Sequence, residues 1–224
     1  MANATGIATD VAARTTPARR RRLPSAGAVK SILFVLALVP LAALGLGAAT
    51  DRLSPNPIED LTRGTGVWTL RFLVLTLAIT PVRRLTGWNA LSRYRRMLGL
   101  FAFFYGTVHL LTYVWFDQFF DVPAILKDIG KRPFITAGIL AFSVLVPLAL
   151  TSTTGWIRRL GGRRWQALHR LVYVAGVAGV IHYYWQVKAD VARPARYGVV
   201  IGLLLLARLV VAARAAASRR APDA

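Results

Sequence analysis

The chain has 224 residues, a formal net charge of +20, and a composition that is 55% hydrophobic and 17% charged. An average soluble chain is about 25% charged, and the apolar residues here gather in runs long enough to cross a bilayer, for which roughly 20 residues suffice. Cysteine is absent, which excludes disulfides, thiolate catalysis and Cys-ligated iron–sulfur clusters.

Residues 1–28 are rich in Ala, Thr and Arg without apolar periodicity, and they predict a disordered basic cytoplasmic tail. A secretory signal peptide is the competing interpretation, because four arginines at 19–22 precede an apolar run. That run, Ile32–Ala49, has 18 residues, whereas the apolar core of a signal peptide has about 7–15. We therefore expect the run to be retained as a membrane anchor.

Six apolar runs predict an all-α integral membrane protein, a bundle of six transmembrane helices. They are Ile32–Ala49, Gly66–Val82, Leu98–Phe116, Phe134–Thr151, Leu171–Val187 and Tyr197–Ala213. The predicted membrane domain covers residues 29–213, and residues 214–224 form a second basic cytoplasmic tail. No separate soluble domain is expected.

The distribution of charge predicts the orientation of the bundle. One alternate set of segments (1–30, 83–96, 153–170 and 214–224) holds 19 of the 29 basic residues and two acids, whereas the other set (50–65, 117–133 and 188–196) holds eight basic residues and seven acids. Basic residues in short loops stay on the cytoplasmic side, so both termini are expected to be cytoplasmic. The basic excess also favours contact with anionic membrane lipid, and nucleic acid is not expected as a partner.

The chain has three histidines, and all lie in or at the edge of a predicted span. His109 belongs to the third span, and we assign His169 and His182 to the fifth. His109 lies 13 residues beyond Arg96, and His182 lies 13 residues beyond His169, each interval corresponding to about 20 Å of helix. His109 and His182 are therefore expected at one depth, where two imidazoles can ligate the iron of a haem between helices three and five.

His169 is expected about 20 Å lower, near the cytoplasmic boundary, where it would serve a second haem. Thirteen residues turn a straight helix by about 220° beyond three full turns. His169 and His182 would then point from different faces, so two haems in one space between the helices require a bent helix. One or two haems are compatible with this pattern.

Glycines in the third and fifth spans are the second feature of this region. Four glycines either leave room for a flat macrocycle or simply allow helices to approach, and both interpretations are open: Gly99, Gly106, Gly176 and Gly179.

Two arginines lie inside predicted spans. Arg71 is a candidate partner for a haem propionate, or else extends to the outer interface, and Arg208 is expected to extend to the cytoplasmic interface.

Three strings carry a resemblance to a known family: RRMLGLFAFFYGTVHLLTY, KRPFITAGILAFSVLVPLALTS and WQALHRLVYVAGVAGVIHYYWQVK. They resemble the MsrQ (YedZ) family, the haem-binding membrane subunits of bacterial methionine sulfoxide reductase systems, within the ferric-reductase-like transmembrane group. The resemblance covers roughly residues 30–213. It implies that His109, His169 and His182 are the haem-ligand positions.

The resemblance also implies a function. Members are inner-membrane b-type cytochromes that pass electrons, apparently from quinol, to a periplasmic molybdenum enzyme, MsrP, which reduces methionine sulfoxide in envelope proteins. FMN is attributed to the family, and no motif in this sequence indicates where it would bind.

From the residues themselves we expect an electron conduit without a substrate-transforming site, since no Ser-His-Asp set, intramembrane carboxylate pair or cysteine nucleophile is present. Residues 214–224 are too few for the flavin and nicotinamide domain of related oxidases, so the donor would be quinol or a separate cytoplasmic reductase. A stand-alone ferric or quinone reductase and a transporter with a histidine proton relay are the alternatives. The outer segments 50–65 and 117–133 are the expected contacts for a partner.

Overall fold

Residues 25–218 are described by a computed structural model, and every regular element within them is helical. Within this part of the chain, five helices are long and apolar enough to cross a membrane, so the chain is a multi-pass membrane protein. They are α1 (Ala26–Ala49), α2 (Pro57–Thr86), α3 (Arg95–Thr112) with its π-helical extension η2 (Tyr113–Asp117), α5 (Pro133–Leu150) and α8 (Ala192–Ser218). All five coincide with predicted spans.

The remaining predicted span, the fifth along the chain, is occupied by α7 (Val172–Gln186), which has 15 residues. This length corresponds to about 22 Å, less than the roughly 30 Å of a hydrocarbon core. The six-span count therefore stays a prediction. Three further elements complete the described part of the fold: η1 (Asn89–Arg93), α4 (Val122–Lys131) and α6 (Thr154–His169).

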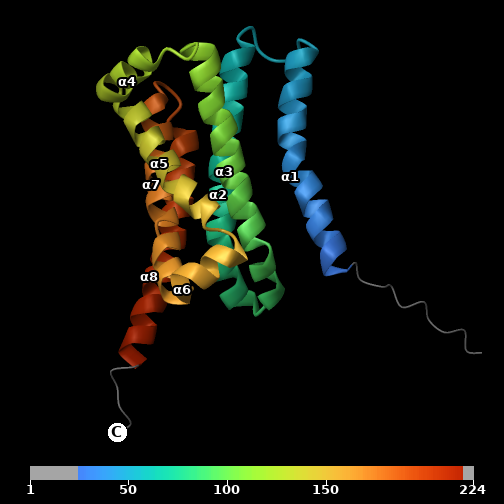
Figure 1. Cartoon of the computed structure of the whole chain (residues 1–224), viewed down its shortest axis with the longest axis vertical. Helices are drawn as coiled ribbons and strands as arrows, with labels where there is room; N and C mark the ends of the chain where they lie inside the picture. Colours follow the sequence, from blue (N-terminus) through green and yellow to red (C-terminus); the bar gives the residue numbers. More distant parts are fainter. Residues whose placement is uncertain (1–24, 219–224) are drawn as a thin grey trace, which may run out of the picture.

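The connections gather at the two ends of the bundle (Figure 1). The α1–α2 connection and α4 lie at one end, and α6 lies at the other, toward which α8 also runs. The arrangement matches the alternation of loops expected from the charges, while the assignment of the α6 end to the cytoplasm stays a prediction. The predicted disorder of residues 1–28 falls largely outside the described residues. Helix α1 begins at Ala26, and α8 continues into the predicted tail at 214–224.

The core lies where α2 packs along α3 and α5 packs along α7. Leu73 and Leu77 of α2, Tyr105 of α3 and Ala175 of α7 are almost completely buried. Large apolar side chains remain exposed on α1 and α8, among them Ile32, Val35, Leu36, Leu46, Val199, Leu203, Leu206 and Leu209. Exposed apolar surface on this scale suits contact with lipid.

Helix α1 contains Pro40, which has no N–H to donate within the helix. The hydroxyl of Tyr105 on α3 reaches this point: it donates to the carbonyl of Ala37 at 2.8 Å and accepts from the N–H of Leu41 at 3.1 Å. One phenol therefore bridges two successive turns of α1 beside its proline. This contact ties α1 to the helix that carries His109.

The prediction that His169 and His182 share one helix was wrong. His169 is the last residue of α6, and α7 begins at Val172. The intervening turn is tight, because the N–H of Leu171 bonds to the carbonyl of Leu168 and that of Tyr173 to the carbonyl of Arg170. The physical reason is polarity: α6 carries four arginines at 158, 159, 163 and 164, so it lies across the end of the bundle rather than through it (Figure 1).

Candidate functional site

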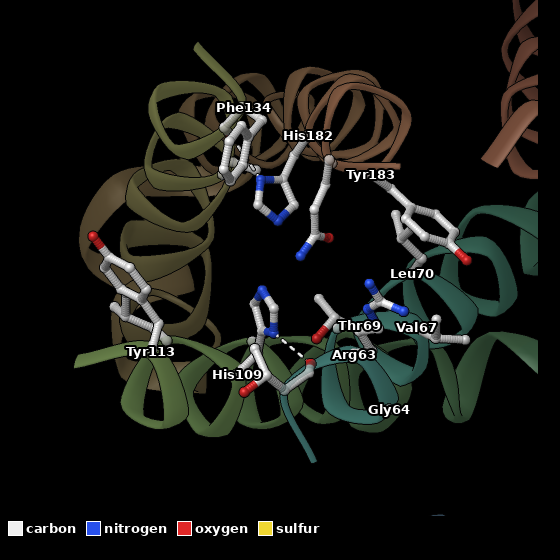
Figure 2. Close-up of a pocket in the computed structure, with 18 of the residues that line it drawn as sticks. Arg63, Gly64, Val67, Thr69, Leu70, His109, Tyr113, Phe134, His182 and Tyr183 are labelled. Carbon is white, nitrogen blue, oxygen red and sulfur yellow. Dashed lines mark hydrogen bonds between the residues drawn. The ribbon is translucent and has the colours of Figure 1, made fainter. Parts of the chain in front are cut away.

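A cavity of about 1370 Å³ lies among α2, α3, α5 and α7. His109 of α3 and His182 of α7 both line it, and Figure 2 shows their rings pointing toward one another across the open space. The prediction that these two histidines share one depth is confirmed. Helices α3 and α7 bring together residues that are 73 positions apart in the sequence.

The separation of the two rings suits a shared metal ion. Their centroids are 5.7 Å apart, and the ring planes make an angle of 76°. Imidazole nitrogens bind metal ions at about 2.0–2.1 Å, so two imidazoles on opposite sides of one ion have centres roughly 6 Å apart. The pair is therefore spaced for one metal between them.

His109 is oriented by helix α2. Its Nδ1 lies 2.8 Å from the carbonyl oxygen of Thr62, and because a carbonyl only accepts, Nδ1 carries the proton. The ring lies against Gly66, where an added Cβ would approach Cε1 to 3.0 Å. With Nδ1 donating, Nε2 is the unprotonated nitrogen, which is the form that ligates a metal.

His182 is oriented by helix α5 in the same way. Its Nδ1 donates to the carbonyl of Phe134 at 2.6 Å, and an added Cβ at Gly138 would come within 2.7 Å of that nitrogen. Sequence reasoning missed Gly66 and Gly138, because they lie on helices other than those of the histidines and nothing in the sequence gives the rotation of one helix against another.

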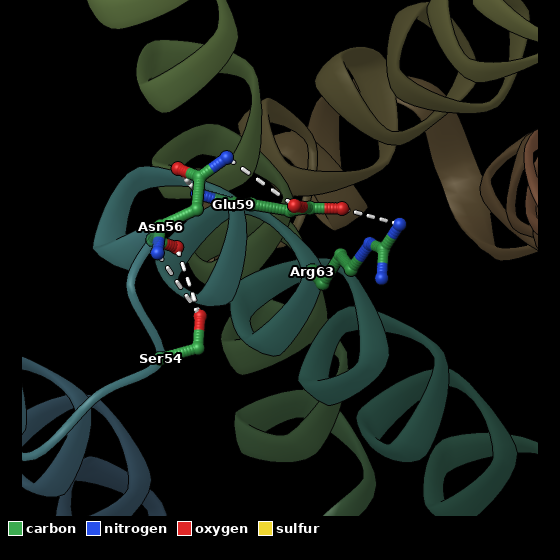
Figure 3. Close-up of polar contacts among 4 residues, drawn as sticks. All are labelled: Ser54, Asn56, Glu59 and Arg63. Atoms are coloured by element: carbon green, nitrogen blue, oxygen red, sulfur yellow. Dashed lines mark hydrogen bonds and ion pairs between the residues drawn. The ribbon is translucent and has the colours of Figure 1, made fainter.

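The first turn of α2 is fixed by a network at its N-terminus (Figure 3). Asn56 accepts a hydrogen bond from the N–H of Glu59, and its own amide donates to the Glu59 carboxylate. Glu59 in turn pairs with Arg63. Such a cap satisfies one of the free N–H groups of a first turn, here that of Glu59. Thr62, whose carbonyl bonds His109, lies between Glu59 and Arg63 in the following turn.

The four glycines predicted from sequence divide into two groups. Gly106 and Gly179 line the cavity, as expected for residues that make room for a ligand. Gly99 faces Thr76, and Gly176 faces Leu77 and Ile201. An added Cβ would make only ordinary contact at these two positions, 3.7 Å from Thr76 and 3.6 Å from Leu77, so both have room for a methyl group.

His169 does not belong to the cavity that contains the other two histidines. Its ring stacks on Trp165 with centroids 3.8 Å apart, and its Nδ1 donates to the carbonyl of Trp165. Burial lowers the pKa of His169, the hydrogen bond to Trp165 opposes this shift, and the positive charge of Arg95 adds to it. Its Nε2 is buried without a hydrogen-bond partner within the described part of the chain.

Arg71 lines the cavity, as expected for a partner of an acidic ligand group. Its Nε donates to the hydroxyl of Tyr197 at 3.3 Å, and its guanidinium lies 4.4 Å from the centre of the Trp68 ring. The prediction for Arg208 was wrong. Instead of extending to the interface, Arg208 turns into the bundle and donates to the hydroxyl of Tyr173 and to the carbonyl of Leu77.

The donor set fits a haem better than a bare metal ion. Within residues 25–218, no group of three or more His, Cys, Asp or Glu side chains is placed to hold a metal. Two opposed imidazoles supply two ligands, so the remaining ligands have to come with the ion. A haem brings four nitrogen ligands of its own, and the cavity, which Gly106 and Gly179 help to line, provides room for it.

Comparison with known proteins places the chain in a family. Residues 65–180 match the model of the ferric reductase like transmembrane component. The chain is 56% identical over 188 residues to a protein-methionine-sulfoxide reductase heme-binding subunit MsrQ of Herminiimonas arsenicoxydans, covering 83% of this chain and 86% of that one. It is 54% identical over 191 residues to the MsrQ of Rhodospirillum rubrum, covering 85% and 92% of the two chains. The chain therefore belongs to the MsrQ family of the ferric-reductase-like transmembrane group.

Proposed function

We propose that this protein is the haem-binding membrane subunit of a methionine sulfoxide reductase system and carries electrons across the inner membrane. His109 and His182 would hold a b-type haem through Nε2, and Arg71 would pair with a propionate. The observation that carries the proposal is the pair of imidazoles facing each other in one cavity, with centroids 5.7 Å apart. The names of the relatives, heme-binding subunits MsrQ, support the same function.

A bound haem accepts and releases single electrons. The protein's own residues would hold it, fix the orientation of its ligands and exclude water from its faces. The ligand type, the burial of the site and the hydrogen bonds to the ligands set the potential. Since Nδ1 of each histidine donates to a carbonyl, both imidazoles are made more electron-rich, and this favours the oxidised iron.

In this proposal the electron donor and the electron acceptor bind at opposite ends of the helix bundle, on the two sides of the membrane. Quinol or a cytoplasmic reductase would deliver electrons near His169, at the α6 end of the bundle, and a periplasmic molybdenum-containing, MsrP-like reductase would receive them at the opposite end. The cavity supports the transfer to the acceptor, because charged residues at that end of the bundle line it: Asp60 near the start of α2, Lys188 in the α7–α8 connection and Arg193 near the start of α8. FMN stays an expectation from the family resemblance alone.

An optical spectrum of the purified protein, oxidised and then reduced, tests the proposal, together with a count of haem per chain. A low-spin b-type spectrum is expected from two imidazole ligands. A count above one would bring in His169 as the ligand of a second haem. A colourless protein from haem-replete cells would contradict the proposal and favour a histidine proton relay in a transporter.

The alternative of a stand-alone ferric or quinone reductase differs in its acceptor. Stopped-flow oxidation of the reduced protein distinguishes the two. A catalytic amount of a purified periplasmic MsrP-like reductase should reoxidise all of the protein only when methionine sulfoxide is present as the final acceptor. Rapid reoxidation by ferric chelates or quinone, with no response to the partner, would favour the alternative.

Arg71→Leu is expected to lower the midpoint potential of the haem by on the order of 50 mV, because a positive charge beside the haem favours the reduced state. Arg71→Lys keeps the charge and should shift the potential less. A redox titration of the three proteins measures the effect. Equal potentials in all three would show that Arg71 has no electrostatic role at the haem.

A further inference from the structure

The two histidines that face the cavity are held by one repeated arrangement. His109 donates to the carbonyl of Thr62 and lies against Gly66, and His182 donates to the carbonyl of Phe134 and lies against Gly138. In both cases the carbonyl belongs to residue i and the glycine to residue i+4 of a neighbouring helix. We define these pairs as the α2 seat (Thr62 and Gly66) and the α5 seat (Phe134 and Gly138).

Helix geometry explains why the spacing is four. In an α-helix the carbonyl of residue i bonds to the N–H of residue i+4, so residue i+4 is the one whose side chain stands beside that carbonyl. A carbonyl has a second lone pair and can accept another hydrogen bond. An imidazole reaches the second lone pair from the side only if residue i+4 has no side chain in the way.

The distances show how little room a side chain would have. A Cβ at Gly138 would lie 2.7 Å from Nδ1 and 3.0 Å from Cε1 of His182. A Cβ at Gly66 would lie 3.0 Å from Cε1 and 3.1 Å from Nδ1 of His109. Since the His182 ring is also bonded to Phe134 at 2.6 Å, it can move away from an added methyl only by giving up that bond.

We propose that Gly66 and Gly138 are positioning residues, which seat the two imidazoles so that each Nε2 is unprotonated and directed at the iron. The inference rests on the proposed haem function. It adds that α2 and α5, which carry no ligand, determine the protonation and the ring orientation of the ligands on α3 and α7. The two seats on separate helices also set the ring planes at 76° to one another.

Alanine substitutions in the full-length protein test the seats. Gly138→Ala is expected to lower haem affinity by about 10–100-fold, the usual cost of losing an outer hydrogen bond to a metal ligand. Gly66→Ala should have a smaller effect in the same direction, because its contacts are longer. Gly176→Ala, on α7 itself, is the matched control: its nearest neighbour would be 3.6 Å away, which is ordinary contact.

Two readouts separate positioning from general packing. The electron paramagnetic resonance g-values of the oxidised protein respond to the angle between the imidazole planes, and should shift in Gly66→Ala and Gly138→Ala but not in Gly176→Ala. Histidine-selective ¹⁵N labelling of the reduced protein follows only three rings, since the chain has three histidines. The Nδ1–H signal of His182 should move or disappear in Gly138→Ala.

Three results would overturn the proposal. The first is wild-type haem affinity, g-values and Nδ1–H signals in both seat variants. The second is an equal loss of haem in Gly176→Ala, which would indicate packing alone. The third is protonation of Nε2 rather than Nδ1 in the wild-type protein, which can be observed even if no haem is bound. Absence of haem with the Nδ1 protons in place would instead contradict the proposed function. If Gly138→Ala does not fold, the test rests on the g-values of Gly66→Ala, and unchanged g-values in that variant would overturn the proposal.

Discussion

His109→Ala and His182→Ala are each expected to lose most of the bound haem, while His169→Ala keeps the haem of the paired site. The reason is geometric. His109 and His182 face each other in one cavity, so the loss of either leaves the iron with one protein ligand. His169 ends a different helix, does not line that cavity and is stacked on Trp165.

Haem per chain and the reduced-minus-oxidised spectrum of each purified variant measure this effect. A chemical rescue sharpens the experiment: His182→Gly leaves a space the size of an imidazole, and added imidazole should restore the low-spin spectrum. The same addition to His169→Gly should leave the spectrum of the paired site unchanged. Equal loss of all haem in the three alanine variants, with the proteins still folded, would contradict the prediction that His169 lies at a different depth and does not serve the haem of His109 and His182.

Tyr105→Ala is expected to destabilise the protein by about 3–5 kcal/mol, and Tyr105→Phe by about 1–3 kcal/mol. Tyr105 is fully buried, and its ring packs on Phe72 and lies near Trp68. Its hydroxyl bridges the carbonyl of Ala37 and the N–H of Leu41. The phenylalanine variant removes only this bridge, so the difference between the two variants separates the hydroxyl from the ring.

Thermal unfolding in one detergent, followed by intrinsic fluorescence, compares these variants. Tyr184→Phe is the control, because Tyr184 lies on α7 with 46% of its surface exposed. It should unfold at the wild-type temperature. An unchanged unfolding temperature in Tyr105→Phe would show that the bridge at Pro40 contributes nothing to the attachment of α1.

Several features of the fold could be predicted from the sequence because they depend on local composition. Long apolar runs can satisfy their backbone groups in a bilayer only as helices, and five of the predicted spans agree with helices of sufficient length and hydropathy. The juxtaposition of His109 and His182 was predicted by counting residues along two helices, although the count for His182 started from His169, which belongs to a different helix. The break after His169 did not follow, since the four arginines of α6 were assigned to a loop although they lie in a helical segment, which bends at Gly161.

The rotation of each helix about its axis was decided only in the tertiary structure. Residue counting gives depth, because the rise per residue is constant, but it does not show which face of a helix meets which neighbour. Arg208 was therefore expected at the interface, and it is bonded to Tyr173 and Leu77. Gly66 and Gly138 were missed for the same reason.

The sequence by itself determined that this chain is a helical membrane protein, that its family is that of the MsrQ subunits, and which two histidines would meet. The fold class depends on composition, the family on sequence motifs, and the pairing of the histidines on the constant rise per residue of a helix. The tertiary structure decided how the imidazoles are held, because Thr62 and Phe134 offer backbone carbonyls, and every residue has such a carbonyl. Only the packing of α2 on α3 and of α5 on α7 selects those two.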